Sequence, residues 1–219
     1  MRHRQVNFDR IARPYWLLEY ITLGRALERT REHFLSALKD AKNALVLGDG
    51  DGRFLAKLLE ENPQLRATAV DTSVTMLHLL GRRCERYADR LQIQRADVRR
   101  SLPHGVEPYD LVVTHFFLDC LTSDELRLLV QRVKSLLAPC ALWVVSDFRI
   151  PKGVLRLPAW LFVGGLYLCF RALTGLRTTH LPNHAAVMTN AGFVRIDRRF
   201  LLGGVLTTEI WRADVKNIR

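Results

Sequence analysis

Cysteine is scarce in this sequence, and its arrangement argues against two common roles. The four cysteines lie far apart and form no C-x-x-C pair, which disfavours a metal site and a disulfide framework. A reducing compartment fits this usage better. The first residues, MRHRQVN, also lack the apolar core of a signal peptide, so we expect a cytoplasmic protein with no bound metal. The cysteines are Cys84, Cys120, Cys140 and Cys169.

Internal repeats, low-complexity tracts and long linkers rich in serine, glycine or proline are also missing. The chain has 219 residues, of which 48% are apolar, so it can bury a sizeable core. We therefore expect a single domain over residues 1–219.

Acidic residues are too few to balance the basic ones: 22 Asp and Glu stand against 33 Lys and Arg, for a net charge of +11. Arginine clusters occur at Arg82-Arg83, at Arg99-Arg100 and around Arg198-Arg199. A solvated basic surface, an anionic substrate, a phospholipid surface and nucleic acid all agree with this charge. The charge alone does not choose among them.

Strand-like and helix-like segments alternate along most of the chain. A helical apolar period covers residues 14–38, where Gly24 can divide it. Ser73 can cap a later helix, and Thr122 with Glu125 forms a T-x-x-E capping box for another. Short apolar strands are expected at 44–47, 66–70, 91–94, 109–114 and 141–145, with helices over 54–59, 76–80 and 126–137.

Two further strands are expected in the tail, over residues 193–200 and 205–211, and Gly203-Gly204 between them makes a hairpin plausible. Alternating strands and helices predict a parallel sheet with helices on both faces. The predicted fold class is therefore α/β, a Rossmann-like three-layer sandwich whose mostly parallel sheet ends in an antiparallel hairpin.

A glycine-rich loop follows the first of these strands. Gly48, Gly50 and Gly52 stand between an apolar strand and a helix, where glycine lets the backbone approach a ligand closely. Asp71 ends the next strand, about 20 residues later, where a carboxylate can bind ribose hydroxyls. Asp97 ends the third strand and can reach an adenine edge. The alternative is that these aspartates only cap helices and form turns.

The loop contains two carboxylates, Asp49 and Asp51, and its glycines are spaced G-x-G-x-G rather than G-x-G-x-x-G. Carboxylates repel a pyrophosphate, which disfavours a dinucleotide. S-adenosylmethionine (SAM) has no phosphate and carries a sulfonium and an ammonium group, so it suits an acidic loop better.

The run LVLGDGDGRF at residues 45–54 resembles motif I of the class I SAM-dependent methyltransferases. FDRIARPY at 8–15 is similar to the N-terminal segment of the ubiquinone/menaquinone-type enzymes, the methyltransferase type 11 group. Asp71 matches the ribose-binding acid, and Asp97-Val98 matches the pair beside adenine. YDLVV at 109–113 and AGF at 191–193 match the fourth strand and the start of the sixth.

This resemblance implies the seven-stranded order 3-2-1-4-5-7-6 with strand seven antiparallel, and SAM as cofactor with S-adenosylhomocysteine as product. It also implies an N-terminal helical cap at 1–40 and a variable substrate cap at 151–190. Val46 stands where the family often has an acid, and we hypothesise that Asp49 replaces it near the ammonium group. The implied cofactor-binding residues are Tyr15, Gly48, Asp49, Gly50, Gly52, Asp71, Thr72, Met76, Asp97, Val98 and His115.

A general base helps methyl transfer when the acceptor is a hydroxyl or an acidic carbon. His115 is the first candidate and Asp119 the second, since both follow the fourth strand. The alternative for His115 is that it only packs beside the cofactor. His180 and His184 are weaker candidates, and His184 is better explained as the start of a helix that packs on the sheet.

Residues 154–173 give the best indication of substrate. The stretch 159–170 is apolar on all sides but shorter than the ~20 residues that span a bilayer. Arg156, Pro158 and Arg171 interrupt any extension of this apolar stretch. The segment can be a lid over an apolar pocket, a surface that contacts a membrane, an ordinary buried helix or a dimer contact.

These features predict a SAM-dependent methyltransferase for a small apolar or aromatic acceptor, with lipid- and quinone-like molecules included. The positive charge supports an RNA or DNA methyltransferase as the alternative. Against it, the fourth strand ends in THFF at 114–117 instead of the D/N-P-P-Y/F signature of amino-group base methylation. A non-catalytic SAM-binding or membrane-associated interaction protein is the third alternative.

Overall fold

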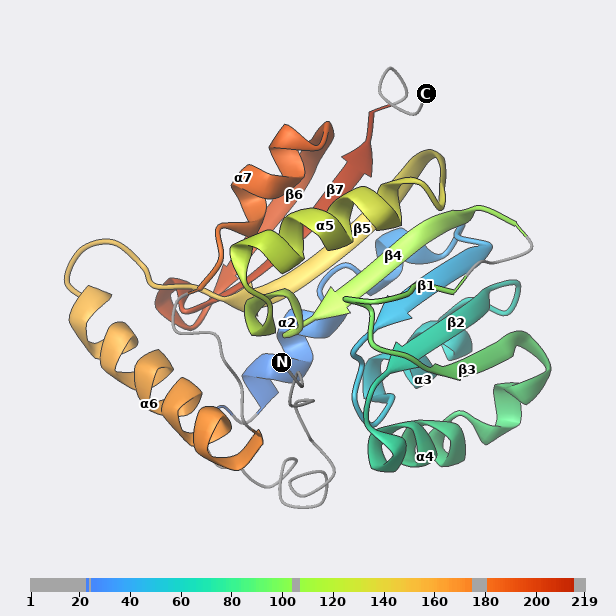
Figure 1. Cartoon of the computed structure of the whole chain (residues 1–219), viewed down its shortest axis with the longest axis horizontal. Helices are drawn as coiled ribbons and strands as arrows, with labels where there is room; N and C mark the ends of the chain where they lie inside the picture. The colour runs from blue at the N-terminus through green and yellow to red at the C-terminus, as the bar shows by residue number, and fades with distance from the viewer. Residues whose placement is uncertain (1–22, 24, 104–106, 175–180, 215–219) are drawn as a thin grey trace.

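A seven-stranded sheet organises the computed structural model, which describes residues 23, 25–103, 107–174 and 181–214. The strand order is β3-β2-β1-β4-β5-β7-β6, as the sequence predicts (Figure 1). β7 runs antiparallel to both β5 and β6, and the other neighbours are parallel. The strands are β1 Asn43–Leu47, β2 Arg66–Asp71, β3 Leu91–Arg95, β4 Tyr109–His115, β5 Leu137–Phe148, β6 Phe193–Leu201 and β7 Leu206–Ala213.

Helices cover both faces of the sheet and complete a three-layer sandwich (Figure 1). The side chains of β1 alternate between two apolar clusters: Leu45 and Leu47 pack beneath α5 and α7, whereas Val46 packs beneath α3. Burial on both faces explains why this strand is a continuous apolar run. The helices are α2 Arg25–Glu32, α3 Arg53–Glu61, α4 Val74–Arg83, α5 Ser123–Lys134, α6 Arg156–Thr174 and α7 His184–Asn190, with 3₁₀ turns η1 Leu35–Leu38, η2 Glu85–Arg90, η3 Leu118–Cys120 and η4 Leu202–Gly204.

The two predicted helix caps are confirmed. The Ser73 hydroxyl accepts a hydrogen bond from the backbone N–H of Met76 at 3.1 Å and starts α4. Thr122 and Glu125 bond reciprocally at 2.9 and 3.3 Å, so the capping box starts α5. Each cap satisfies N–H groups that the first helical turn leaves without a partner.

Two boundaries differ from the sequence prediction. Within the described residues the helix expected over 14–38 divides after Glu32, and η1 turns Leu35 and Leu38 into the core beside α3. The fifth strand, expected over 141–145, extends over 137–148 because it pairs with β4 on one side and β7 on the other. Local periodicity does not reveal pairing on two sides, so the prediction was too short.

α6 covers most of the segment 154–173 that the sequence singled out. It includes Pro158 in its first turn. Proline is tolerated in a first helical turn because the N–H group it lacks would have no partner there. The helix lies at the periphery, on the side toward which the parallel strands point (Figure 1). Among the helices of the described ranges, none is long and apolar enough to cross a membrane.

Candidate active site

The glycine loop between β1 and α3 holds its three glycines in the left-handed region, with φ of 71°, 62° and 78°. A Cβ atom at Gly52 would lie 2.8 Å from Cγ of Leu80, so close packing against α4 requires glycine there. A Cβ atom at Gly50 would meet nothing nearer than Sδ of Met76 at 3.9 Å. Gly52 therefore allows close packing against α4, whereas the space beside Gly50 is part of the pocket.

A pocket lies at the carboxyl ends of β1, β2, β3 and β4, which is where open α/β sheets bind ligands. Most of the predicted cofactor residues line it together. Gly52 does not, because it is buried against α4, and Tyr15 lies outside the described residues. The predicted residues that line the pocket are Gly48, Asp49, Gly50, Asp71, Thr72, Met76, Asp97, Val98 and His115.

The two acids of the loop have different partners. The Asp51 carboxylate accepts hydrogen bonds from Arg53 and Arg83, both at 3.0 Å. Asp49 accepts one from the backbone N–H of Leu55 at 3.1 Å and forms no ion pair within the described part of the chain. Burial raises the pKa of Asp49 to about 7. Asp49 is therefore the loop acid placed to receive a cationic group.

The aspartates at the carboxyl ends of β2 and β3 form local turns and also line the pocket. Asp71 accepts a hydrogen bond from the backbone N–H of Ser73 at 2.9 Å. Both oxygens of Asp97 accept from the Arg99 guanidinium at 2.8 Å, and this pair lowers the pKa of Asp97. The sequence presented turn formation and ligand binding as alternatives, but the same side chains can do both.

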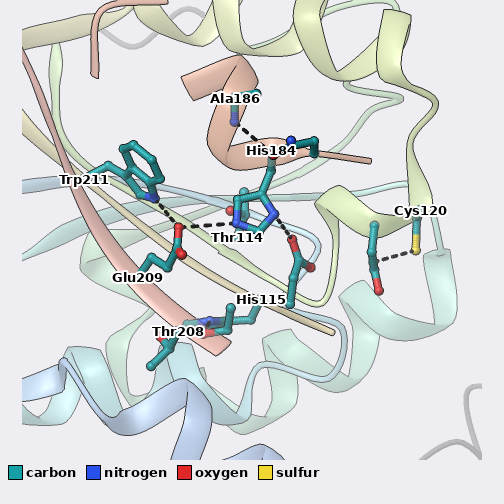
Figure 2. Close-up of polar contacts among 12 residues, drawn as sticks. Thr114, His115, Cys120, His184, Ala186, Thr208, Glu209 and Trp211 are labelled. Atoms are coloured by element: carbon teal, nitrogen blue, oxygen red, sulfur yellow. Dashed lines mark hydrogen bonds and ion pairs between the residues drawn. The ribbon is translucent and has the colours of Figure 1, made fainter. Parts of the chain in front are cut away.

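His115 is buried at the end of β4 and lies close to other side chains (Figure 2). Its Nδ1 is 2.8 Å from Oγ of Ser146, which is 2.9 Å from Oγ1 of Thr208. Its Nε2 is buried without a hydrogen-bond partner among the described residues, and the Phe54 ring meets the imidazole edge-on at 4.3 Å. Burial lowers the pKa of His115 well below its usual value, and Arg31 adds to this, so the ring is neutral.

Asp119 lies on η3 and faces α6. One carboxylate oxygen accepts a hydrogen bond from the Tyr167 hydroxyl at 2.6 Å, and Asp119 and Tyr167 both line the pocket. Burial raises the pKa of Asp119. The segment predicted to cap the substrate site thus contributes a polar group to the pocket, which the sequence did not indicate.

A second polar cluster surrounds His184 at the start of α7 (Figure 2). Its Nδ1 is 3.6 Å from the buried carboxylate of Asp147, and its Nε2 is 3.4 Å from Glu209. Glu209 also accepts hydrogen bonds from Trp211 at 3.0 Å and Arg195 at 3.2 Å. His184 begins a helix that packs on the sheet, as expected, and it does not line the pocket. His180 lies outside the described residues.

Several pocket residues were missed by sequence reasoning. Arg31 of α2 lines the pocket, and its guanidinium lies 5.2 Å from the centre of the Phe116 ring. Phe116 has a positive φ of 53°, an uncommon conformation for an aromatic residue and one often found at functional sites. Phe148 packs on Phe116 with ring centres 5.2 Å apart. No motif marks these positions, because chain folding alone brings them together.

Comparison with known proteins identifies a methyltransferase domain. Residues 45–142 match the family model described as a methyltransferase domain. No curated protein matches the sequence. Among solved structures, the mitomycin 7-O-methyltransferase is similar over 87% of this chain and 54% of its own, with 19% identity and a TM-score of 0.66. The chain thus spans about half the length of that protein.

Two other solved structures show the same fold. The N-methyltransferase NodS from Bradyrhizobium japonicum, in complex with S-adenosylhomocysteine, is similar over 85% of this chain and 87% of its own, with 18% identity and a TM-score of 0.63. A putative O-methyltransferase from Nostoc punctiforme is similar over 91% of this chain and 60% of its own, with 18% identity and a TM-score of 0.69. The methyltransferase family model matches residues 45–142 of this chain, and the similar structures share its fold.

Proposed function

We propose that this chain transfers the methyl group of SAM to a small apolar or aromatic acceptor of lipid or quinone type. The composition of the pocket carries this proposal, because its lining combines the polar groups of the glycine loop with aromatic rings. Phe116, Phe117 and Phe148 contribute those rings, and α6 adds Leu166 and Tyr167. Such a wall suits a flat or apolar acceptor and excludes water from the reacting atoms.

The residues around the glycine loop fit the charges of SAM. Asp49 suits the ammonium and sulfonium groups, because its carboxylate lines the pocket without an ion pair among the described residues. Arg31 suits the carboxylate of the cofactor, since it lies close enough to influence the pKa of Asp49. Asp71 is the proposed partner of the ribose hydroxyls. The cofactor supplies an activated methyl group, so the protein chiefly aligns the acceptor.

Asp119 is a better supported base than His115, which reverses the order of preference from sequence. Asp119 lines the pocket, and its raised pKa suits a group that must take up a proton. His115 is neutral and its Nε2 is buried, which favours a role as a wall beside the cofactor. We therefore assign Asp119 as the base for a hydroxyl or carbon acid, with Tyr167 as its positioning residue.

Nucleic acid is the weaker substrate class. The aromatic lining favours a small acceptor, and the basic surface remains the argument for RNA or DNA. A non-catalytic SAM-binding protein would keep the cofactor residues without a working base. We also propose that the protein works in the cytoplasm, because its cysteines form no C-x-x-C pair and fit a reducing compartment.

The decisive experiment incubates cell extract with the protein and methyl-labelled SAM, then separates the organic phase from RNA. We expect label in the organic phase, and none with Asp71→Ala. Asp119→Asn should keep its affinity for SAM while kcat falls about 100-fold or more. Label confined to RNA would overturn the acceptor class, and SAM binding without transfer to any fraction would support the non-catalytic alternative.

A further inference from the structure

α6 presents an apolar face to solvent as well as to the protein. Ala159 and Val163 point inward and are 4% and 3% exposed. On the opposite side Leu157, Trp160, Leu161 and Leu168 are between 57% and 68% exposed. These outward positions are three, four and eleven residues from the first, so they lie on one side of the helix. Four large exposed apolar side chains on one side of a helix form the kind of patch that marks an interaction surface.

The charged residues that neighbour this outward face in the sequence are of a single sign. The sequence from Phe148 to Ile196 contains no aspartate or glutamate. Within it Lys152 and Arg156 are exposed just before and at the start of α6, beside the protruding Val154. An acid-free stretch of this length is unexpected in a chain with 22 acidic residues. The patch is therefore apolar along the helix and cationic at its N-terminal end.

We propose that α6 docks this protein on an anionic phospholipid membrane, with Leu157, Trp160, Leu161 and Leu168 inserted among the headgroups. Lys152 and Arg156 contact the lipid phosphates. Apolar residues including tryptophan, bordered by cations, are the composition of helices that lie in the membrane interface. A second copy of the chain fits less well, because the segment offers no acid to pair with the cations of its partner.

Docking goes beyond methyl transfer and does not depend on which acceptor is methylated. The inward side of the same helix contributes Leu166 and Tyr167 to the pocket. A membrane bound to the outward side would thus lie one helix away from the acceptor wall.

Sedimentation with lipid vesicles tests the proposal directly. We expect the protein to bind vesicles of phosphatidylcholine mixed with phosphatidylglycerol, and to bind phosphatidylcholine alone weakly. Trp160→Ser with Leu161→Ser should lower the partition coefficient about tenfold or more. Lys152→Gln and Arg156→Gln should each lower it about fivefold, and added salt should have the same effect. Trp160 fluorescence should shift to the blue on binding, and Trp160→Phe should keep binding while losing that shift.

Matched controls lie elsewhere on the surface. Leu128→Ser replaces an apolar residue of α5 that is 51% exposed, and Arg82→Gln removes an exposed cation of α4. Both should bind vesicles like the unaltered protein, and calorimetric SAM binding should be unchanged in every variant. No binding to anionic vesicles, or equal loss in the control variants, would overturn the proposal. A dimer in sedimentation analysis that Trp160→Ser dissociates, without vesicle binding, would identify the patch as a contact between copies instead.

Discussion

Neighbouring residues of the glycine loop have different tasks that their sequence does not distinguish. Asp49 and Asp51 alternate with glycines and both line the pocket, yet two arginines bind Asp51 whereas Asp49 has no ion pair among the described residues. The difference arises because Arg83, at the end of α4, approaches Asp51. A sequence motif therefore locates the loop, whereas the packing of neighbouring helices decides which carboxylate is available to a ligand.

The two glycines with different surroundings give a matched pair of variants. Gly52→Ala should lower the free energy of unfolding by about 2–4 kcal/mol, because it adds a clash with Leu80 to the strain of a left-handed residue. Gly50→Ala should cost only the strain, about 1–2 kcal/mol, but should weaken SAM binding about tenfold or more. Denaturant unfolding and calorimetry measure the two effects. If both variants were equally stable, Gly52 would not have the packing role assigned to it here.

Asp49 should make SAM binding depend on pH. The pKa of Asp49 in the free protein is about 7, so half of the Asp49 side chains are neutral at pH 7. A cationic ligand favours the ionised form. Affinity should therefore rise as the pH increases from about 5 through 7, and level off above about pH 8, where Asp49 is already ionised in the free protein. Calorimetry across this range should show the rise, and Asp49→Asn should remove it. If SAM affinity in Asp49→Asn still rose with pH in the same way, another group would be responsible for the effect.

At the level of elements, one partly buried histidine connects α7 to the strands β5 and β7. His184 lies between Asp147 of β5 and Glu209 of β7, and both carboxylates are almost fully buried. Burial raises the pKa of Asp147, whereas His184 and Arg195 lower that of Glu209 despite its burial. The histidine thus offsets part of the cost of enclosing two acids beneath a short helix.

Removing that histidine should destabilise the fold in a way that depends on pH. His184→Ala should lower the free energy of unfolding at pH 7 by about 3 kcal/mol, because two buried carboxylates lose a partner. Burial raises the pKa of Asp147, and a protonated Asp147 needs no cationic partner, so the deficit should shrink as the pH is lowered. Adding Asp147→Asn should restore part of the loss at pH 7. Urea unfolding of the single and double variants gives these values. If the effects of the two substitutions on the free energy of unfolding simply added, His184 and Asp147 would not be coupled.

For the whole molecule, the sequence predicted what local patterns and connection rules determine. The strand order and the Gly48 to Gly52 loop follow from alternating elements and from the resemblance to the methyltransferases, and both are present. Arg31, Tyr167 and the surroundings of His184 could not be predicted. They depend on how α2, α6 and α7 pack on the sheet, and on an antiparallel register that sets Asp147 near Glu209. Side chains distant in sequence meet there without any periodic signal.

The proposed ligand should stabilise the molecule as a unit, since the pocket joins the ends of β1 to β4 with α2 and α6. A ligand at 100 times its Kd adds about 2.7 kcal/mol, which corresponds to a rise in Tm of about 5–10 °C for a chain of this size. Thermal unfolding with SAM or S-adenosylhomocysteine should show this rise, and Asp71→Ala should abolish it. NAD should have no effect, because the carboxylate of Asp49 would repel its pyrophosphate. A shift with NAD that exceeded the shift with SAM would place the chain among the dinucleotide-binding proteins instead.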